Sequence, residues 1–112
     1  MRISIIGAGS VGFTQKLVRD ILKVKELQDI EISLHDISSN NLNLVEQLIK
    51  KDISANKLPT RIVTSLNRQE SIDGAKYIIN CSRVGGIDAF KYDIEIPLKY
   101  GVDQCVGDTI CA

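Results

Sequence analysis

The fold of this chain is decided by its first twelve residues, in which Arg2-Ile3-Ser4-Ile5-Ile6 is followed at once by Gly7-Ala8-Gly9-Ser10-Val11-Gly12. The isoleucine-rich run ends at a glycine, which is typical of a short buried strand. After the glycines, apolar side chains recur every three or four residues, which predicts a helix running to about Val24. The expected apolar face of that helix consists of Val11, Leu17, Val18, Ile21 and Leu22.

The glycines form a complete G-x-G-x-x-G pattern, and its position between a strand and a helix is the context that makes the pattern specific. We expect Gly7 to allow a tight turn, Gly9 to let backbone approach a pyrophosphate, and Gly12 to let the helix pack closely against a sheet. Unpaired amides at the start of the helix attract phosphates. The loop therefore predicts dinucleotide binding, with Ser10 as an additional hydroxyl donor and Val11 beside it.

The rest of the chain alternates between strand and helix patterns. The expected strands cover residues 30–34, 61–64 and 75–80, and the expected helices cover residues 38–56 and 87–100, with one helical turn inside 67–73. The apolar face of the helix at 38–56 would consist of Leu44, Val45, Leu48 and Ile49. Pro97 is expected to kink or restart the last helix, and Gly101 suits its C-terminal cap. This order predicts an α/β fold, a Rossmann-like doubly wound parallel sheet that is truncated after about four strands.

Asp36 ends the second expected strand, close to the spacing of about 20 residues after the glycine motif that dinucleotide-binding folds show. A carboxylate there accepts hydrogen bonds from the adenosine ribose hydroxyls and repels a 2′-phosphate, which favours NAD over NADP. Ile37 follows it and joins the predicted cofactor site. The alternative is an ordinary strand-end aspartate that caps a turn. The neighbouring His35 is interpreted as a packed or solvated residue rather than a catalyst.

Polar residues follow the fourth expected strand, where ligands bind in this fold class. Asn80 and Ser82 are predicted to contribute to the cofactor site. Arg83 is either a clamp for a substrate anion or hydroxyl, or a solvated loop charge. Cys81, between them, is interpreted as a small apolar filler.

Composition excludes several classes of protein. The chain has 112 residues, of which 44% are apolar and 25% charged, so it is expected to fold as one domain rather than remain disordered. Fourteen basic residues balance fourteen acidic ones, which argues against nucleic-acid binding. No apolar run approaches the length of a membrane span or a signal peptide, and three cysteines without a pairing motif favour reduced thiols, so we expect a cytoplasmic protein.

Longer stretches resemble glycoside hydrolase family 4, in particular its α-galactosidase and α-glucosidase branch. The stretches are Ile5-Ile6-Gly7-Ala8-Gly9-Ser10-Val11-Gly12-Phe13, His35-Asp36-Ile37, Arg83-Val84-Gly85-Gly86, Ile96-Pro97-Leu98-Lys99-Tyr100-Gly101-Val102-Asp103-Gln104 and Gly107-Asp108-Thr109. The resemblance implies glycoside hydrolysis by transient oxidation of the sugar at C3 with NAD, elimination, addition of water and re-reduction. It also implies a divalent metal, Mn²⁺, that polarises the C2 and C3 oxygens. The family is an exception to two-carboxylate glycosidase chemistry.

The same resemblance implies a division of labour among the residues. Gly7, Gly9, Ser10 and Gly12 would hold the pyrophosphate and Asp36 the ribose, while Arg83 and Asp108 would contact the sugar. The catalytic base and the metal ligands of the family are expected beyond residue 112. We therefore expect residues 1–112 to be the N-terminal NAD-binding part of a homo-oligomeric enzyme, with no catalytic residue or metal ligand of its own and no activity alone.

Two other interpretations remain open from the sequence. The chain could be the first half of a lactate- or malate-type dehydrogenase, since the glycine motif alone does not separate these families. It could also be a non-catalytic dinucleotide-binding remnant that self-associates. The strand expected at residues 75–80 would lie at a sheet edge, whose unpaired amides and carbonyls are a template for pairing with a second copy.

Overall fold

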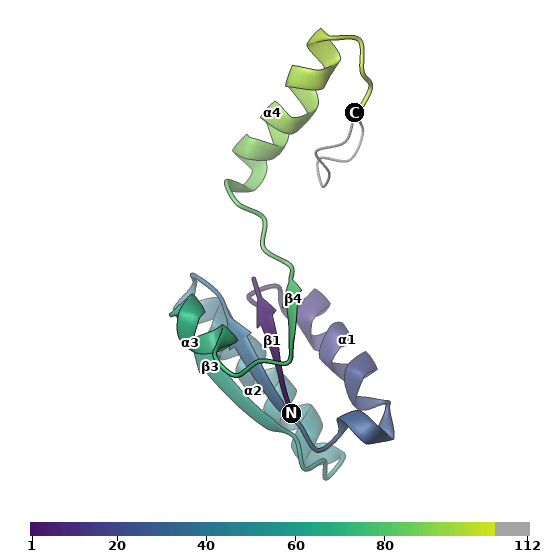
Figure 1. The fold of residues 1–112 in the computed structure, drawn as a ribbon, viewed down its shortest axis with the longest axis vertical. Helices are drawn as coiled ribbons and strands as arrows, with labels where there is room; N and C mark the ends of the chain where they lie inside the picture. The colour runs from purple at the N-terminus through teal and green to yellow at the C-terminus, as the bar shows by residue number, and fades with distance from the viewer. Residues whose placement is uncertain (105–112) are drawn as a thin grey trace. The chain divides into compact units, whose positions relative to one another are not determined.

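The computed structural model describes residues 1–104, which divide into two compact units, one from Met1 to Ser82 and one that begins at Arg83. The elements of the first unit, in chain order, are β1 (Arg2–Ile6), α1 (Val11–Leu22), the 3₁₀ helix η1 (Lys25–Leu27), β2 (Glu31–His35), α2 (Ser39–Ala55), β3 (Arg61–Ser65), α3 (Arg68–Ile72) and β4 (Tyr77–Asn80) (Figure 1). The second unit contains α4 (Gly86–Lys99). No helix in the described part of the chain is long and apolar enough to cross a membrane.

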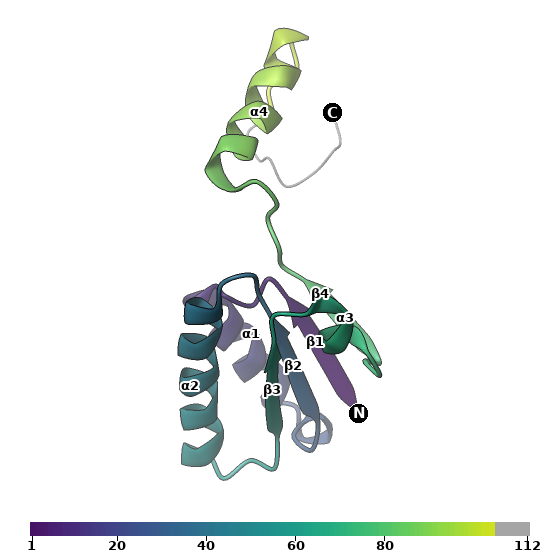
Figure 2. The same cartoon turned by 90° about the vertical axis from the view of Figure 1, so that its left-hand side faces the viewer.

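The four strands form one parallel sheet in the order β3-β2-β1-β4. This confirms the predicted α/β fold with a parallel sheet of four strands. Since successive side chains of a strand point to opposite faces, the residues of β1 separate the two sides of the sheet. Ile3 and Ile5 belong to the apolar core under α1 and α2, which lie together on one face (Figure 2). Ser4 points to the opposite face, toward α3.

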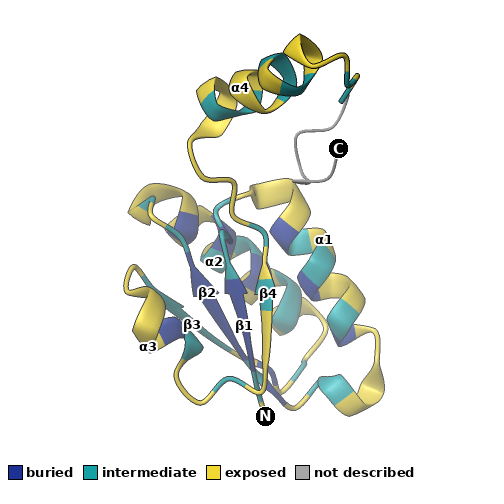
Figure 3. Cartoon of the chain, turned by 45° about the horizontal axis from the view of Figure 1, so that its top comes forward, coloured by how far each residue is buried: buried dark blue, intermediate teal, exposed yellow. Residues whose placement is uncertain are grey.

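The main core lies between the sheet and the pair α1–α2, and the central strands β1 and β2 are the most deeply buried part (Figure 3). Its fully buried members include Ile5, Ile32, Leu34, Val18, Val45 and Ile49. On the opposite face of the sheet, hydrogen bonds between serine hydroxyls hold α3 against the strands. The buried Ser71 Oγ of α3 lies 3.0 Å from Ser4 Oγ and 2.9 Å from Ser33 Oγ, so one serine connects α3 to both central strands.

The predicted helix faces needed correction. In α2 the buried face is Leu42, Val45 and Ile49, at helical spacing, whereas Leu44 is 47% exposed. In α1 the predicted face is confirmed at Leu17, Val18, Ile21 and Leu22, but Val11 is exposed and a buried Thr14 joins the face. The helix ends at Leu22, two residues before the predicted end. Both errors arise because several apolar stripes fit the pattern, and only packing against the sheet selects one of them.

Residues 83–104, the described part of the second unit, form the helix α4 with its flanking turns. The helix α4 continues through Pro97 to Lys99, so of the two outcomes predicted at this proline, a kink or a restart, the restart is wrong. A proline near the end of a helix removes only one late amide, which explains why the helix continues for two more residues. Gly101 has φ +76°, in the left-handed region, which confirms its predicted place just after the helix.

Candidate functional site

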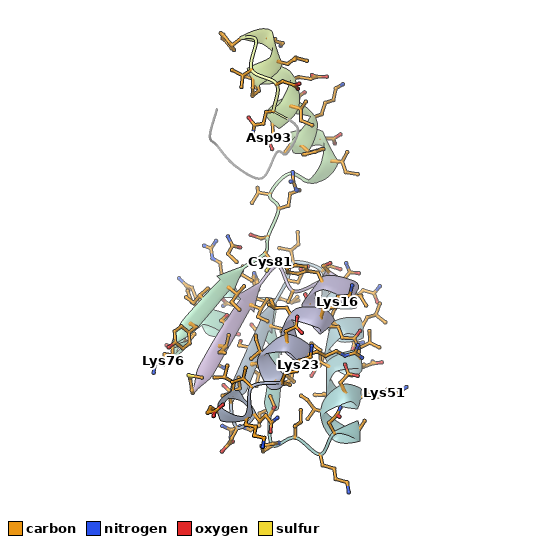
Figure 4. All side chains as sticks on the ribbon, turned by 90° about the vertical axis from the view of Figure 1, so that its right-hand side faces the viewer. Lys16, Lys23, Lys51, Lys76, Cys81 and Asp93 are labelled. Atoms are coloured by element: carbon orange, nitrogen blue, oxygen red, sulfur yellow. The ribbon has the colours of Figure 1, made fainter. Side chains whose placement is uncertain are left out.

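The candidate site lies at the carboxyl ends of β1, β2 and β4. Gly7 follows β1, Asp36 follows β2, and Cys81 and Ser82 follow β4, and parallel pairing brings these segments to one edge of the sheet. Figure 4 marks this edge by Cys81, while Lys76 lies at the opposite end of β4. Ligands of open α/β sheets bind in this position.

The turn after β1 is clamped between its two neighbouring strands. The Gly7 and Ala8 amides both donate to the His35 carbonyl, each at 2.9 Å. Gly7 has φ +81°, and a Cβ added there would lie 2.6 Å from the backbone nitrogen of Ser82. The geometry confirms the predicted tight turn and adds a second reason for the glycine, which is the close approach of the chain that leaves β4.

Gly9 contacts Asp36 directly. Its amide donates to Asp36 Oδ2 at 2.7 Å, and the other carboxylate oxygen, Oδ1, accepts from the Ser38 amide at 2.9 Å. A Cβ added to Gly9 would lie 2.6 Å from Asp36 Oδ2. The structure therefore brings together two residues that the sequence assigned to different parts of the cofactor, one to the pyrophosphate and one to the ribose.

The start of α1 is open to solvent. Ser10 is the N-cap residue with an extended backbone, and the four residues from Ser10 to Phe13 are exposed. The first amides of a helix have no carbonyl partner within it, so those of α1 are available to an anion. The predicted close packing of Gly12 is wrong for the described chain, because, apart from its chain neighbours and the backbone of its own helix, nothing in residues 1–104 lies within 4 Å of a Cβ built there.

One contact of the loop was missed from the sequence. The buried Thr14 Oγ1 donates to the Ala8 carbonyl at 2.9 Å, which ties the first turn of α1 back onto the glycine loop. The sequence feature that could have indicated this contact is a threonine four residues before Val18, on the apolar face of the helix. Thr14 thus helps to hold the glycine loop from the buried side, away from solvent.

Two further predicted residues lie at the same edge. Asn80 Oδ1 accepts hydrogen bonds from the Ser82 amide at 3.1 Å and from Ser82 Oγ at 2.6 Å, so the two side chains stabilise the turn after β4 together. Ile37, next to Asp36, is 95% exposed. An apolar side chain so exposed beside the loop is a surface on which an aromatic base can pack.

The two predicted sugar contacts belong to the part of the chain after the first unit. Arg83 belongs to the second unit, where its guanidinium lies 4.8 Å from the centre of the Phe90 ring. Asp108 lies outside the described residues. Between residues 1 and 104, no group of three or more histidine, cysteine, aspartate or glutamate side chains is placed to hold a metal ion.

The plainer interpretations of two neighbours are confirmed. His35 is buried, and its Nδ1 lies 3.0 Å from the Ser65 carbonyl, so the ring is part of the packing between β2 and β3. Cys81 packs against the apolar core, and burial raises the pKa of its thiol. A raised pKa keeps the thiol protonated and unreactive, as expected of a filler.

Comparison with known proteins identifies the family of this chain. Residues 2–112 match the sequence profile of the family 4 glycosyl hydrolases. An alpha-galactosidase of Rhizobium meliloti (strain 1021) is 56% identical over 111 residues, which are 99% of this chain and 23% of that protein. An alpha-galactosidase of Bacillus subtilis (strain 168) is 32% identical over 97% of this chain and 26% of that protein.

Solved structures agree with this assignment. The 6-phospho-beta glucosidase of Thermotoga maritima, in a crystal form with manganese, NAD⁺ and glucose-6-phosphate, superposes with a TM-score of 0.75 at 32% identity, over 92% of this chain and 25% of that one. The chain thus spans about a quarter of the length of the relatives it matches. This chain belongs to the family 4 glycosyl hydrolases.

Proposed function

We propose that residues 1–82 form the NAD-binding part of a family 4 glycosidase. The observation that carries the proposal is the open start of α1 beside the Asp36 carboxylate, at the carboxyl edge of a parallel sheet. Support comes from two 6-phospho-glucosidases whose structures were solved with NAD. They superpose on this chain with TM-scores of 0.75 and 0.73. Family membership favours this function over the lactate or malate dehydrogenase alternative.

In the proposed complex, the amides of Ser10, Val11 and Gly12 face the pyrophosphate, while the Gly9 amide remains bonded to Asp36. The Asp36 carboxylate accepts from the adenosine ribose. A carboxylate has about four acceptor positions, and protein amides use two of them, so acceptor capacity remains for ribose hydroxyls. Ile37 offers apolar surface to the adenine, and Asn80 with Ser82 borders the site on the β4 side.

For the whole enzyme we propose hydrolysis of α-glycosides, on the basis of the 56% identity to an alpha-galactosidase. NAD, when bound, would accept a hydride from C3 of the sugar and later return it. The contribution of this chain is to bind and orient that cofactor. Arg83 and Asp108 are the proposed sugar contacts. No residue of this chain is proposed as a catalytic base or a manganese ligand.

Isothermal titration calorimetry tests the proposal on this 112-residue chain. We expect saturable heat on titration with NAD⁺ and weaker binding of NADP⁺, because its 2′-phosphate would meet the Asp36 carboxylate. The matched control is Asp29→Ala, which removes an exposed aspartate just before β2 and should bind NAD⁺ as the unchanged chain does. The absence of saturable heat at millimolar NAD⁺ would contradict the proposal.

A further inference from the structure

The contact between Gly9 and Asp36 joins the turn after β1 to the end of β2. The Gly9 amide donates to Asp36 Oδ2 at 2.7 Å, although the two residues are 27 positions apart in the sequence. A hydrogen bond to a charged carboxylate is stronger than one between neutral groups. The glycine loop is therefore held by the residue that would also meet the ribose.

The need for glycine at position 9 follows from the same contact. Gly9 is not among the residues with positive φ, so an L-amino acid could adopt its backbone conformation. The three atoms nearest to an added Cβ all belong to Asp36, at 2.6, 2.7 and 2.9 Å. An alanine at this position would therefore push the Asp36 carboxylate aside, and the carboxylate would give up its hydrogen bond to the Gly9 amide.

Asp36 also holds a second segment. Its Oδ1 accepts from the Ser38 amide at 2.9 Å, and Ser38 is the N-cap residue of α2, where its Oγ accepts from the Asn41 amide. One carboxylate thereby connects the glycine loop, the end of β2 and the start of α2. Removing it leaves two amides, from two different loops, without their acceptor.

We propose that Asp36 is a positioning residue that sets the glycine loop in its binding conformation before the cofactor arrives, and so acts on the pyrophosphate as well as on the ribose. The proposal rests on the proposed NAD-binding function. Its consequence for specificity is that replacing Asp36 weakens binding of NAD⁺ and NADP⁺ together, rather than exchanging one for the other.

The first test needs no cofactor. Urea unfolding is measured for the unchanged chain, Gly9→Ala, Asp36→Ala and the double variant. We expect Gly9→Ala to lower the folding equilibrium constant about fivefold or more when Asp36 is present, and to change it much less when Asp36 is alanine, because the clash is then gone. An equal loss in both backgrounds would overturn the proposal.

A spectroscopic readout follows the loop itself. In Asp36→Ala we expect the exchange protection of the Gly9 amide to fall about tenfold or more and its proton resonance to move upfield, while amides of β3 are unchanged. If Asp36→Ala does not fold, Asp36→Leu serves instead, since its side chain branches as that of aspartate does but offers no acceptor to either amide. An unchanged Gly9 amide in the variant contradicts the proposal.

The third test separates the two roles of Asp36. Calorimetry compares NAD⁺ with an NAD⁺ analogue that lacks the adenosine 2′ and 3′ hydroxyls, on the unchanged chain, Asp36→Ala and the Asp29→Ala control. If Asp36 acts only on the ribose, its removal leaves the affinity for the analogue unchanged, which would refute the proposal. We expect that affinity to fall about tenfold. Failure of the unchanged chain to bind NAD⁺ at all would contradict the proposed function, while the unfolding cycle would still decide the role of Asp36.

Discussion

Replacing Gly7 with alanine should be among the most damaging single changes in residues 1–82. Its φ of +81° lies in the left-handed region, which costs a residue with a Cβ about 1–2 kcal/mol. The added Cβ would also lie 2.6–2.8 Å from backbone atoms of Cys81 and Ser82, which cannot rotate away as a side chain could. Displacing the end of β4 costs about 1–3 kcal/mol more. We therefore expect the free energy of unfolding to fall by about 2–5 kcal/mol.

Two other glycines provide matched controls. Gly74 has φ +66°, but nothing in the described chain lies within 4 Å of its added Cβ, so Gly74→Ala should cost only the backbone strain of about 1–2 kcal/mol. Gly12 has neither a positive φ nor a close neighbour in residues 1–104, so Gly12→Ala should leave stability unchanged or raise it by up to about 1 kcal/mol.

The assay is urea unfolding followed by circular dichroism, with the slope of the transition unchanged across the series. We expect Gly12→Ala to be the most stable of the three variants, Gly74→Ala to be less stable and Gly7→Ala to be the least stable. The reasoning would be refuted if Gly7→Ala were no less stable than Gly74→Ala, because the close approach of the chain leaving β4 would then contribute nothing.

Three further predictions concern the packing of the first unit. The Arg19 guanidinium, 2.8 Å from Asp52 Oδ2, holds the pKa of that carboxyl below its ordinary value of 3.8. Because the folded pKa is the lower one, the pair stabilises the fold above pH 3.8 and loses this effect as the pH falls through the folded value. The urea midpoints of the unchanged chain and Asp52→Asn should thus differ at pH 7 and approach each other as the pH falls well below 3.8; a difference that does not change with pH would contradict this. Ser71→Ala should cost about 1–3 kcal/mol in the same unfolding assay, since two buried hydroxyls lose their shared partner, and a cost below about 0.5 kcal/mol would show that water replaces it. Finally, no strand among residues 1–104 pairs with the outer edge of β4, where Ile78 is 54% exposed, so the chain should self-associate in light scattering. Ile78→Lys should abolish this, Leu44→Lys on α2 should not, and a monomer at high concentration would refute it.

Most of the fold could be predicted because its signals are local. An isoleucine run before Gly7, the alternation in β2 and the helical spacing in α1 each need only neighbouring residues to be recognised. The prediction was wrong where two sets of apolar residues on one helix fit helical spacing equally well. Leu42 and Leu44 are both leucines near the start of α2, and only the position of the sheet decides that the first is buried and the second exposed.

The candidate site divides in the same way. The glycine motif and Asp36 were recognisable because their spacing reflects a recurrent strand–turn–helix unit. The hydrogen bond between Gly9 and Asp36 was not, because it joins residues 27 positions apart through a side chain whose direction the sequence does not encode. The contact of Thr14 with the Ala8 carbonyl escaped for a related reason, since a buried threonine looks like an interruption of an apolar face.

The sequence by itself determined the alternation of strands and helices, the parallel sheet and the place of the glycine loop, because these depend on short-range periodicity and on residues that relieve local strain. Only the tertiary structure decided why each glycine is there. Gly7 is required by its φ and by the backbone that leaves β4, Gly9 by the Asp36 carboxylate, and Gly12 by nothing in residues 1–104. The reason is physical: a missing Cβ is explained by the atoms that would occupy its space, and those atoms come from parts of the chain that only folding brings near.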